Sequence, residues 1–254
     1  MVMEKIYRLH YRAQLKDMTG DMLLSEKQEA VRQCVEAVRK AQQEGKLLTA
    51  ALYYDKRALY FYYEAMGQDL AVTEPIAAKE GEQCLPESGE DVQASVLKPW
   101  ELLAPLNDFL QSWPGQTKAR LWVHMYHIYY HDIPDTVEGW KRERKPERRR
   151  GRIAFLRDSK LFSYVYYHKG LVDEGLICGD RYQSIALHEN ILFSYFEEPR
   201  GSVNIKKDYE HESKVLEEWL AIDPESHFIH MPEGEGANFM FLPEIFALGV
   251  EDAE

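Results

Sequence analysis

The spacing of hydrophobic and polar residues predicts a strand and then a helix in the first part of the chain. Residues 5–15 alternate β-favouring and polar side chains, which predicts a strand before a turn at Gly20-Asp21. Small apolar residues then recur at spacings of three and four, as on one face of a helix. We place the start of this helix at Ser25, with Gln28 completing a capping box, and its end at Gly45.

The next pattern predicts a hairpin. Tyrosine-rich runs at 47–54 and 58–64 flank a short turn, so the order so far is β-α-β-β. Residues 67–97 are rich in Gly, Pro and acidic residues and predict an irregular loop. An apolar-periodic segment at 99–110 predicts a second helix, and the aromatic, β-branched run 120–131 predicts a long strand.

The hairpin recurs later in the chain. Residues 52–64 align without a gap with residues 185–197. The identical pairs are Leu59/Leu192, Tyr62/Tyr195 and Glu64/Glu197. Glu44-Gly45 and Glu174-Gly175 stand at the end of a predicted helix before each hairpin. This indicates an internal repeat, although any two tyrosine-rich hairpins share some of these features.

The second copy continues with an amphipathic stripe at 206–221 and an apolar run at 238–248, which predict a helix and a closing strand. The predicted fold class is therefore α+β, with two tandem ferredoxin-like βαββαβ units packed as a pseudo-dimeric α+β barrel. We expect the first unit, with a degenerate site, at 1–117 and the second, with the candidate site, at 118–254.

Composition narrows the classes of protein. The 254 residues include 31 Lys and Arg against 43 Asp and Glu, a formal charge of −12, and 45% are hydrophobic. This excludes a disordered chain and argues against nucleic acid as a partner. No apolar run is long enough to span a membrane, the N-terminus lacks the apolar core of a signal peptide, and three dispersed cysteines (Cys34, Cys84 and Cys178) suggest free thiols. We expect a cytoplasmic protein without a membrane partner.

The sequence contains no common phosphate-loop, hydrolase or zinc motif, so we expect no metal and no cofactor. Three histidines (His124, His127 and His131) lie close together, but on a strand they cannot converge on one metal ion. Strand geometry would instead place His127, Tyr129 and His131 on one face, lining a polar cavity. Ordinary core packing is the alternative for each of them.

A basic run occupies residues 141–152, with eight Lys or Arg and two Glu. Such a run can bind phosphate groups or nucleic acid. Because no aromatic residue is interleaved, we favour a solvated helical surface or an oligomer contact.

The predicted helix 161–175 carries the clearest candidate site. Tyr164 and His168 are four residues apart and therefore project from one face, with Glu174 near the helix end. The first copy has Cys34 and Val38 at the corresponding positions. The alternative is that this Tyr and His have no role in a site and simply lie at the edge of the buried face of the helix.

These residues resemble the L-rhamnose mutarotase family. The motifs are Tyr164-x-x-x-His168 with Glu174, then Tyr182-Gln-Ser-Ile-Ala-Leu-His188 and Leu192-Phe-Ser-Tyr-Phe-Glu197. The resemblance covers roughly residues 160–200, and the family's dimeric α+β barrel agrees with the fold expected from the repeat.

The resemblance implies a sugar-binding isomerase that interconverts anomers of an aldose such as rhamnose, with a monosaccharide as ligand. His168 would act as acid/base with Tyr164 as its partner, and Glu174 would assist. The contacts expected to bind the substrate are His127, Tyr129, His131, Tyr182 and His188. Two alternatives stay open: a non-catalytic metabolite-binding or regulatory module, and a cofactor-independent or haem-linked monooxygenase on the same barrel. A homodimer also stays open.

Overall fold

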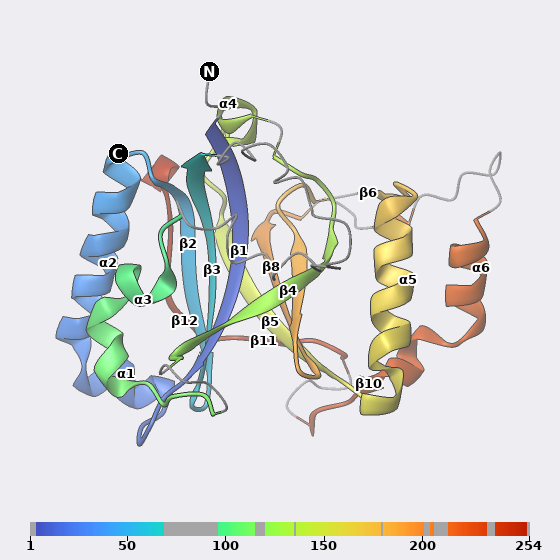
Figure 1. Cartoon of the computed structure of the whole chain (residues 1–254), viewed down its shortest axis with the longest axis horizontal. Helices are drawn as coiled ribbons and strands as arrows, with labels where there is room; N and C mark the ends of the chain where they lie inside the picture. The colour runs from blue at the N-terminus through green and yellow to red at the C-terminus, as the bar shows by residue number, and fades with distance from the viewer. Residues whose placement is uncertain are drawn as a thin grey trace, which may run out of the picture.

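The structure is a computed structural model of the chain. It describes residues 4–68, 96–114, 120–134, 136–178, 180–200, 204–205, 213–232 and 237–252. The fold is mixed α+β, built around one curled antiparallel sheet with helices on two opposite flanks (Figure 1). In the described part of the chain, no helix is both long and apolar enough to cross a membrane.

The strands of the main sheet run in the spatial order β10-β5-β8-β7-β4-β1-β3-β2-β12, with β11 also paired to β5. Their bounds are β1 (Glu4–Gln14), β2 (Leu47–Asp55), β3 (Ala58–Gln68), β4 (Trp122–Tyr130), β5 (Arg148–Leu156), β7 (Ser184–His188), β8 (Ile191–Glu198), β10 (Phe228–Ile229), β11 (Met240–Phe241) and β12 (Glu244–Gly249). The short strands β6 (Ile177–Cys178) and β9 (Asn204–Ile205) pair separately.

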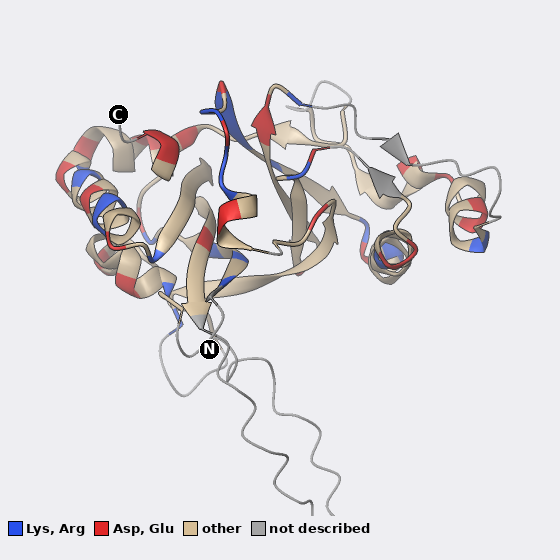
Figure 2. Ribbon diagram, turned by 90° about the horizontal axis from the view of Figure 1, so that it is seen from above, with Lys and Arg blue, Asp and Glu red and all other residues tan. Residues whose placement is uncertain are grey.

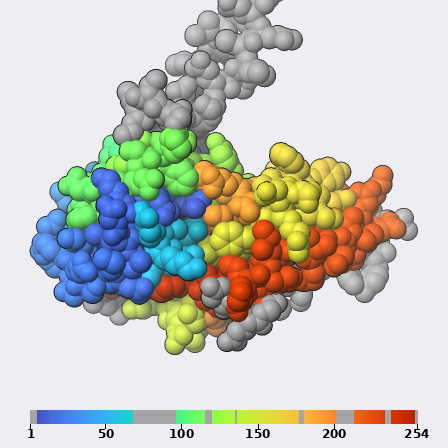
Figure 3. All heavy atoms as spheres, turned by 90° about the horizontal axis from the view of Figure 1, so that it is seen from below, coloured from blue at the N-terminus to red at the C-terminus, as the bar shows by residue number. Residues whose placement is uncertain are grey.

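The last segment of the chain closes the sheet on itself. β11 pairs with β5 and β12 pairs with β2, and only two residues separate β11 from β12. Both of these residues continue the link, because the Leu242 N–H donates to the Gly151 carbonyl (2.9 Å) and the Pro243 carbonyl accepts from the Tyr54 N–H (3.1 Å). Figure 3 shows this C-terminal segment in red beside the cyan β2–β3 hairpin. The two ends of the sheet are thus joined into a barrel.

Helices cover the barrel on both flanks (Figure 1). On one flank are α1 (Gly20–Glu26), α2 (Gln28–Gln43), α3 (Pro99–Leu102) and the 3-10 turn η1 (Ala104–Phe109). On the other are α5 (Leu161–Asp173) and α6 (Lys214–Ala221), while α4 (Val137–Trp140) lies at one end. The remaining 3-10 turns are η2 (Asp158–Lys160), η3 (Pro224–His227) and η5 (Val250–Asp252).

Three hydrophobic clusters fill the barrel interior and the spaces between the sheet and the helices on its two flanks. The first lies between the sheet and α2, and includes Cys34, Val38 and Phe61. The second fills the barrel interior with side chains from both halves of the chain. Its members include Tyr53, Tyr60, Tyr62, Met125, Ile153, Phe193 and Tyr195. The third lies beneath α5 and α6, on the outer face of the second half. Figure 2 shows the strands mostly tan, with many of the charged residues on the helices.

Most predicted elements are present. The strands expected at 5–15 and 120–131, both hairpins and the helix at 161–175 all form. The two aligned hairpins turn at equivalent residues, and Lys56 (φ 52°) and Glu189 (φ 55°) both adopt the left-handed conformation there. The loop expected at 67–97 falls mainly outside the described residues, as does the segment 206–212 of the second predicted amphipathic helix.

The predicted start of the first helix is wrong. Gly20 and Asp21 begin α1 instead of forming a turn, and Thr19 caps this helix through its side chain. Ser25 lies in the last turn of α1, where its hydroxyl donates to the Asp21 carbonyl (2.9 Å). Tertiary packing explains the glycine, because a Cβ on Gly20 would overlap the Tyr54 ring.

Two further expectations need correction. The segment 99–110 is not one helix, since four α-helical residues give way to the 3-10 turn η1 around Pro105. The basic run is not a helical surface, because residues 148–152 form the first part of β5 and Arg142 and Arg149 are buried. Carboxylates brought from distant parts of the chain make that burial tolerable.

Candidate functional site

Tyr164 and His168 form the centre of the candidate site on α5. The helix period places them on one face, and their rings stack with centroids 3.8 Å apart and an interplanar angle of 22°. His168 Nδ1 lies 3.0 Å from the Tyr164 carbonyl oxygen. Because a carbonyl oxygen only accepts, Nδ1 must carry the proton and donate it. The other nitrogen, Nε2, therefore holds the free lone pair of a neutral ring.

Other elements bring three more side chains to this pair. Tyr129, at the end of β4, meets His168 edge to face at 5.7 Å, and its hydroxyl lies 3.0 Å from His131 Nε2. Trp219 from α6 meets His168 edge to face at 4.9 Å. We call Tyr129, His131, Tyr164, His168 and Trp219 the α5 cluster. Of the seven predicted site residues other than His168, Tyr164 and Tyr129 contact its ring, and His131 joins the cluster through Tyr129.

Burial sets the protonation states in the α5 cluster. It lowers the pKa of His168 to about 4, against a smaller opposing effect of the hydrogen bond to the Tyr164 carbonyl. Burial likewise lowers the pKa of His131 to about 4, with Arg8 and Arg200 acting in the same direction. The pKa of the Tyr164 hydroxyl is raised, again chiefly by burial. At neutral pH both histidines are therefore neutral and Tyr164 is protonated.

Strand geometry predicted that His127, Tyr129 and His131 share one face. This prediction is wrong for His127, which lies on the other face. The pairing of β4 with β7 shifts register between His127 and Tyr129, so a bulge turns the strand's later residues to the other side. Tyr129 belongs to the cluster beneath α5, while His127 meets His10, whose ring contacts Tyr62 in the barrel interior. A bulge of this kind leaves no mark in the alternation of residue types.

The partners of His127 were missed from the sequence. His127 Nε2 lies 2.7 Å from Nδ1 of the fully buried His10, whose Nε2 lies 3.3 Å from the Ser184 hydroxyl. These three residues come from β4, β1 and β7, which only the tertiary structure brings side by side. Burial lowers the pKa of His10, and that of His127 to about 3. The rough alternation in β1 was the one available signal, since it places His10 on the face opposite Leu9 and Tyr11.

The remaining predicted residues lie outside the α5 cluster. Glu174 ends α5 as an exposed C-cap and accepts a hydrogen bond from the Ser213 hydroxyl (2.5 Å). Tyr182 packs on Trp140 and on the Arg142 guanidinium, which lies 3.8 Å from its ring centroid. His188 stands at the β7–β8 turn, 5.2 Å from the Trp113 ring. None of these three contacts His168.

A buried charged group occupies one end of the barrel. Arg142 donates to both Glu64 (2.5 and 2.9 Å) and Glu197 (2.7 Å), and these are the two glutamates paired by the repeat. Each glutamate also accepts a bond from the tyrosine two residues before it, Tyr62 (2.6 Å) or Tyr195 (2.7 Å). The repeat could have suggested the pairing of the carboxylates, but not the arginine between them.

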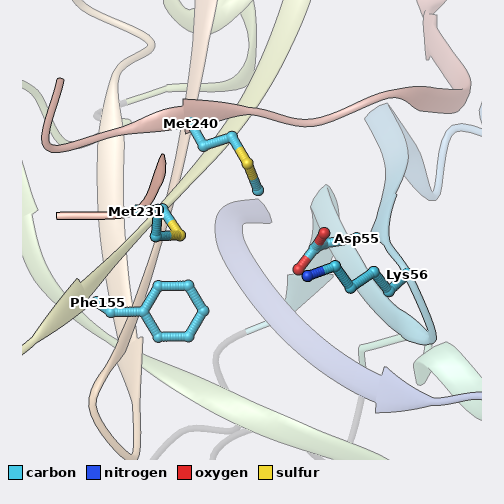
Figure 4. Close-up of a pocket in the computed structure, with 5 residues that line it drawn as sticks. All are labelled: Asp55, Lys56, Phe155, Met231 and Met240. Atoms are coloured by element: carbon cyan, nitrogen blue, oxygen red, sulfur yellow. The ribbon is translucent and has the colours of Figure 1, made fainter. Parts of the chain in front are cut away.

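A cavity of about 310 Å³ lies at the opposite end of the barrel, between the β2–β3 turn and the second half (Figure 4). Asp55 and Lys56 form one side, and Phe155, Met231 and Met240 form the other. Phe155 and Met240 pack against the interior cluster, so this cavity lies on the opposite side of the sheet from His168. Its ring and two thioethers suit an apolar group.

The described part of the chain contains neither a metal site nor a reactive thiol. Within the described ranges, no group of three or more His, Cys, Asp or Glu side chains could hold a metal ion. Cys34 is a free, buried thiol, and burial raises its pKa to about 12, which makes it unreactive. Cys84 lies outside the described residues.

Comparisons with known proteins give structural neighbours only. No protein-family model and no curated protein matches the chain. A candidate monooxygenase from Lactobacillus acidophilus NCFM is 9% identical with a TM-score of 0.40, and the match covers 96% of each chain. A second candidate monooxygenase, from Fusobacterium nucleatum subsp. nucleatum ATCC 25586, is 10% identical with a TM-score of 0.39, over 98% of this chain and 96% of that one. At these scores neither neighbour decides the chemistry of this protein.

Proposed function

We propose that the protein is an enzyme that removes a proton from an acidic hydroxyl group on a planar aromatic compound and then adds oxygen to the ring, as a cofactor-independent monooxygenase. The observation that carries this proposal is the fixed tautomer of His168. Its Nδ1 proton is held by the Tyr164 carbonyl, which leaves Nε2 as a base. No described residue forms a hydrogen bond with Nε2, so its lone pair is available to accept a proton.

The reaction balances with oxygen as the second substrate. His168 takes the hydroxyl proton, and the resulting anion passes electrons to O₂. One oxygen atom forms a new bond to the ring carbon, the O–O bond breaks, and the other atom leaves as water with two hydrogens from the substrate. A naphthol thus becomes a naphthoquinone, and all four electrons come from the substrate. The anion formed beside the imidazole would raise the pKa of His168, because an adjacent negative charge favours the imidazolium.

The aromatic composition of the α5 cluster supports a planar substrate. Tyr164, Tyr129 and Trp219 surround His168 with aromatic faces and edges at centroid distances of 3.8 to 5.7 Å. Aromatic rings bind one another through offset-stacked and edge-to-face contacts of this kind.

The same arrangement gives less support to sugar anomerisation, the reaction that the resemblance implied. Ring opening needs an acid as well as a base, and the carboxylate expected to assist, Glu174, bonds Ser213 outside the cluster. The two histidines of the cluster are both neutral near pH 7 because burial lowers the pKa of each to about 4. Neither histidine is therefore an imidazolium that could donate a proton to the ring oxygen near pH 7.

The test is oxygen uptake with 2-naphthol, measured with an oxygen electrode alongside formation of the quinone by absorbance. We expect uptake by the wild-type protein and a loss of at least tenfold in His168→Ala. His188→Ala is the matched control, because this histidine lies at the β7–β8 turn away from the cluster, and its rate should match the wild type.

Two outcomes would overturn the proposal. Uptake that is equal in His168→Ala and the wild type removes the role of the base. The second outcome would come from saturation-transfer NMR of L-rhamnose. Exchange between its anomers that depends on His168, without oxygen uptake, would establish mutarotase activity instead.

We also propose that the chain is a tandem duplication of a ferredoxin-like unit, packed as a pseudo-dimeric barrel. The orders β4-β1-β3-β2 and β10-β5-β8-β7 follow the same pattern along the chain, which supports two copies. The helices before the hairpins also end alike, at Gly45 (φ 70°) and Gly175 (φ 66°), with matching hydrogen bonds back to the last turn. In this arrangement β4 is the fourth strand of the first copy, which favours a boundary between β4 and β5 over the expected boundary at 117/118.

A further inference from the structure

We propose that Arg152 and Arg200 form an anion-binding site beside the α5 cluster, and that the substrate of the enzyme is a hydroxylated aromatic carboxylate. The proposal rests on the function proposed above and names its substrate class. Arg152 lies on β5, on the face that also carries Ala154 beneath α5, while Ile153 points into the barrel. Arg200 follows the end of β8, the strand paired with β5 (Figure 1).

The two guanidinium groups share one aromatic ring. Arg152 lies 5.1 Å and Arg200 4.4 Å from the centroid of Phe196. Arg152 also lies 4.3 Å from the ring of Phe239. A planar anion between these groups would meet aromatic faces as well as two guanidinium forks.

Neither arginine has a carboxylate partner in the described part of the chain. Arg152 Nε donates to the Ser194 hydroxyl (3.4 Å), and Arg200 donates to the Gln183 side-chain oxygen (2.6 Å), so both partners are neutral. Asp180 interacts electrostatically with Arg200, but no ion pair within 4 Å joins them. By contrast, Arg142, Arg149 and Arg150 each pair with a carboxylate.

A half-buried guanidinium, that of Arg152, is costly beside a second cation when no carboxylate is paired with either of them. Burial, and then the charge of Arg200, lower the pKa of Arg152 to about 10. An anionic ligand relieves both effects, since it neutralises the pair and can accept two parallel hydrogen bonds from a guanidinium.

The site adjoins the proposed base. The Tyr164 and Tyr129 hydroxyls both interact electrostatically with Arg152, and both tyrosines contact the His168 ring. A ligand with its carboxylate at the arginines therefore points its ring toward His168. A hydroxyl at the end of the ring system far from the carboxylate would then lie nearest to the proposed base.

The experiment is calorimetric titration of the full chain with 6-hydroxy-2-naphthoate and with its neutral isostere, 6-hydroxy-2-naphthamide. We expect the carboxylate to bind the wild-type protein at least tenfold more tightly than the amide. This comparison needs no variant, so it stands even if a substitution impairs folding. Equal affinities, or no binding of the carboxylate, would overturn the proposal.

Variants then locate the site. Arg152→Met and Arg200→Met should each lose at least tenfold in affinity for the carboxylate and little for the amide, with Arg152→Lys retaining part of the preference. Arg150→Met is the matched control, because Arg150 lies on the same strand and over a phenylalanine ring (5.2 Å) but is paired with Glu198. A loss as large in Arg150→Met as in Arg152→Met would overturn the assignment.

This readout is separate from oxygen uptake. Arginine-dependent binding of the carboxylate without uptake would refute the monooxygenase and keep the anion site. Oxygen uptake with 2-naphthol but equal binding of the carboxylate and the amide would refute the anion site and keep the monooxygenase.

Discussion

Glu64 and Glu197 hold the same guanidinium, that of Arg142, from opposite halves of the chain. All three side chains are almost fully buried, at 0%, 6% and 3% exposure respectively. The tyrosines beside them, Tyr62 and Tyr195, stack with centroids 3.8 Å apart. One cation therefore joins the β2–β3 hairpin to the β7–β8 hairpin.

Removing that cation should destabilise the protein strongly. Arg142→Met leaves two buried carboxylates without their partner, and we expect the free energy of unfolding to fall by about 3–5 kcal/mol. Urea denaturation measures this change in the free energy of unfolding. The control is Lys141→Met, because Lys141 forms only an exposed pair with Glu138 (2.8 Å) and should change stability by less than about 0.5 kcal/mol. A loss below about 1 kcal/mol in Arg142→Met would contradict this account.

The same cluster predicts a loss of stability in acid. Burial alone would raise the pKa of Glu64, but Arg142 overrides it and lowers this pKa from 4.5 to about 2. The folded-state pKa lies below the unfolded one, so the stabilisation is complete above pH 4.5 and is lost as the pH falls toward 2. We expect Glu64→Gln to show a flatter dependence than the wild type between these values in urea titrations. Parallel curves would show that Glu64 does not titrate in this way.

The imidazole of His168 should remain neutral well below its ordinary range. With its pKa lowered to about 4 by burial, its ring-proton NMR resonances should shift with a midpoint near pH 4, against about 6.5 in urea. Because the unfolded chain binds the proton first, this contribution to stability is complete above pH 6.5 and is lost as the pH falls to 4. A midpoint near 6.5 in the folded protein would remove the reason for calling His168 a neutral base.

The two helix-ending glycines provide a matched pair of tests. Gly45→Ala and Gly175→Ala force an alanine into the left-handed conformation, which costs about 1–2 kcal/mol of stability. Steric overlap does not add to this cost. A Cβ on Gly45 would lie 3.8 Å from the Met66 side chain, and a Cβ on Gly175 would have no described atom within 4 Å. Thermal or urea unfolding should show similar losses for both. Gly175→Asn should lose less, because asparagine tolerates this conformation better, and equal losses for Asn and Ala would point to a different cause.

Local sequence patterns were enough to predict the hairpins, the helix α5 and the pairing of Tyr164 with His168. Each depends on residues close in the chain: a turn between two β-favouring runs, or two side chains four apart on a helix. The same reasoning failed at the start of α2, where no side chain caps the helix, and at Gly20, whose glycine is required by the ring of Tyr54.

The amino-acid sequence was enough to predict the periodicity of the strands and helices and the proximity of Tyr164 to His168, and to suggest the repeat. The folded arrangement was needed to show that Arg142 lies between Glu64 and Glu197 and that a bulge sends His127 and Tyr129 to opposite faces. It was also needed to show that Arg152 and Arg200 pair with no carboxylate among the described residues. The difference lies in how far apart along the chain the interacting residues are. Backbone periodicity and helix capping act over a few residues, whereas the cost of burying a charge depends on which distant strands lie beside it.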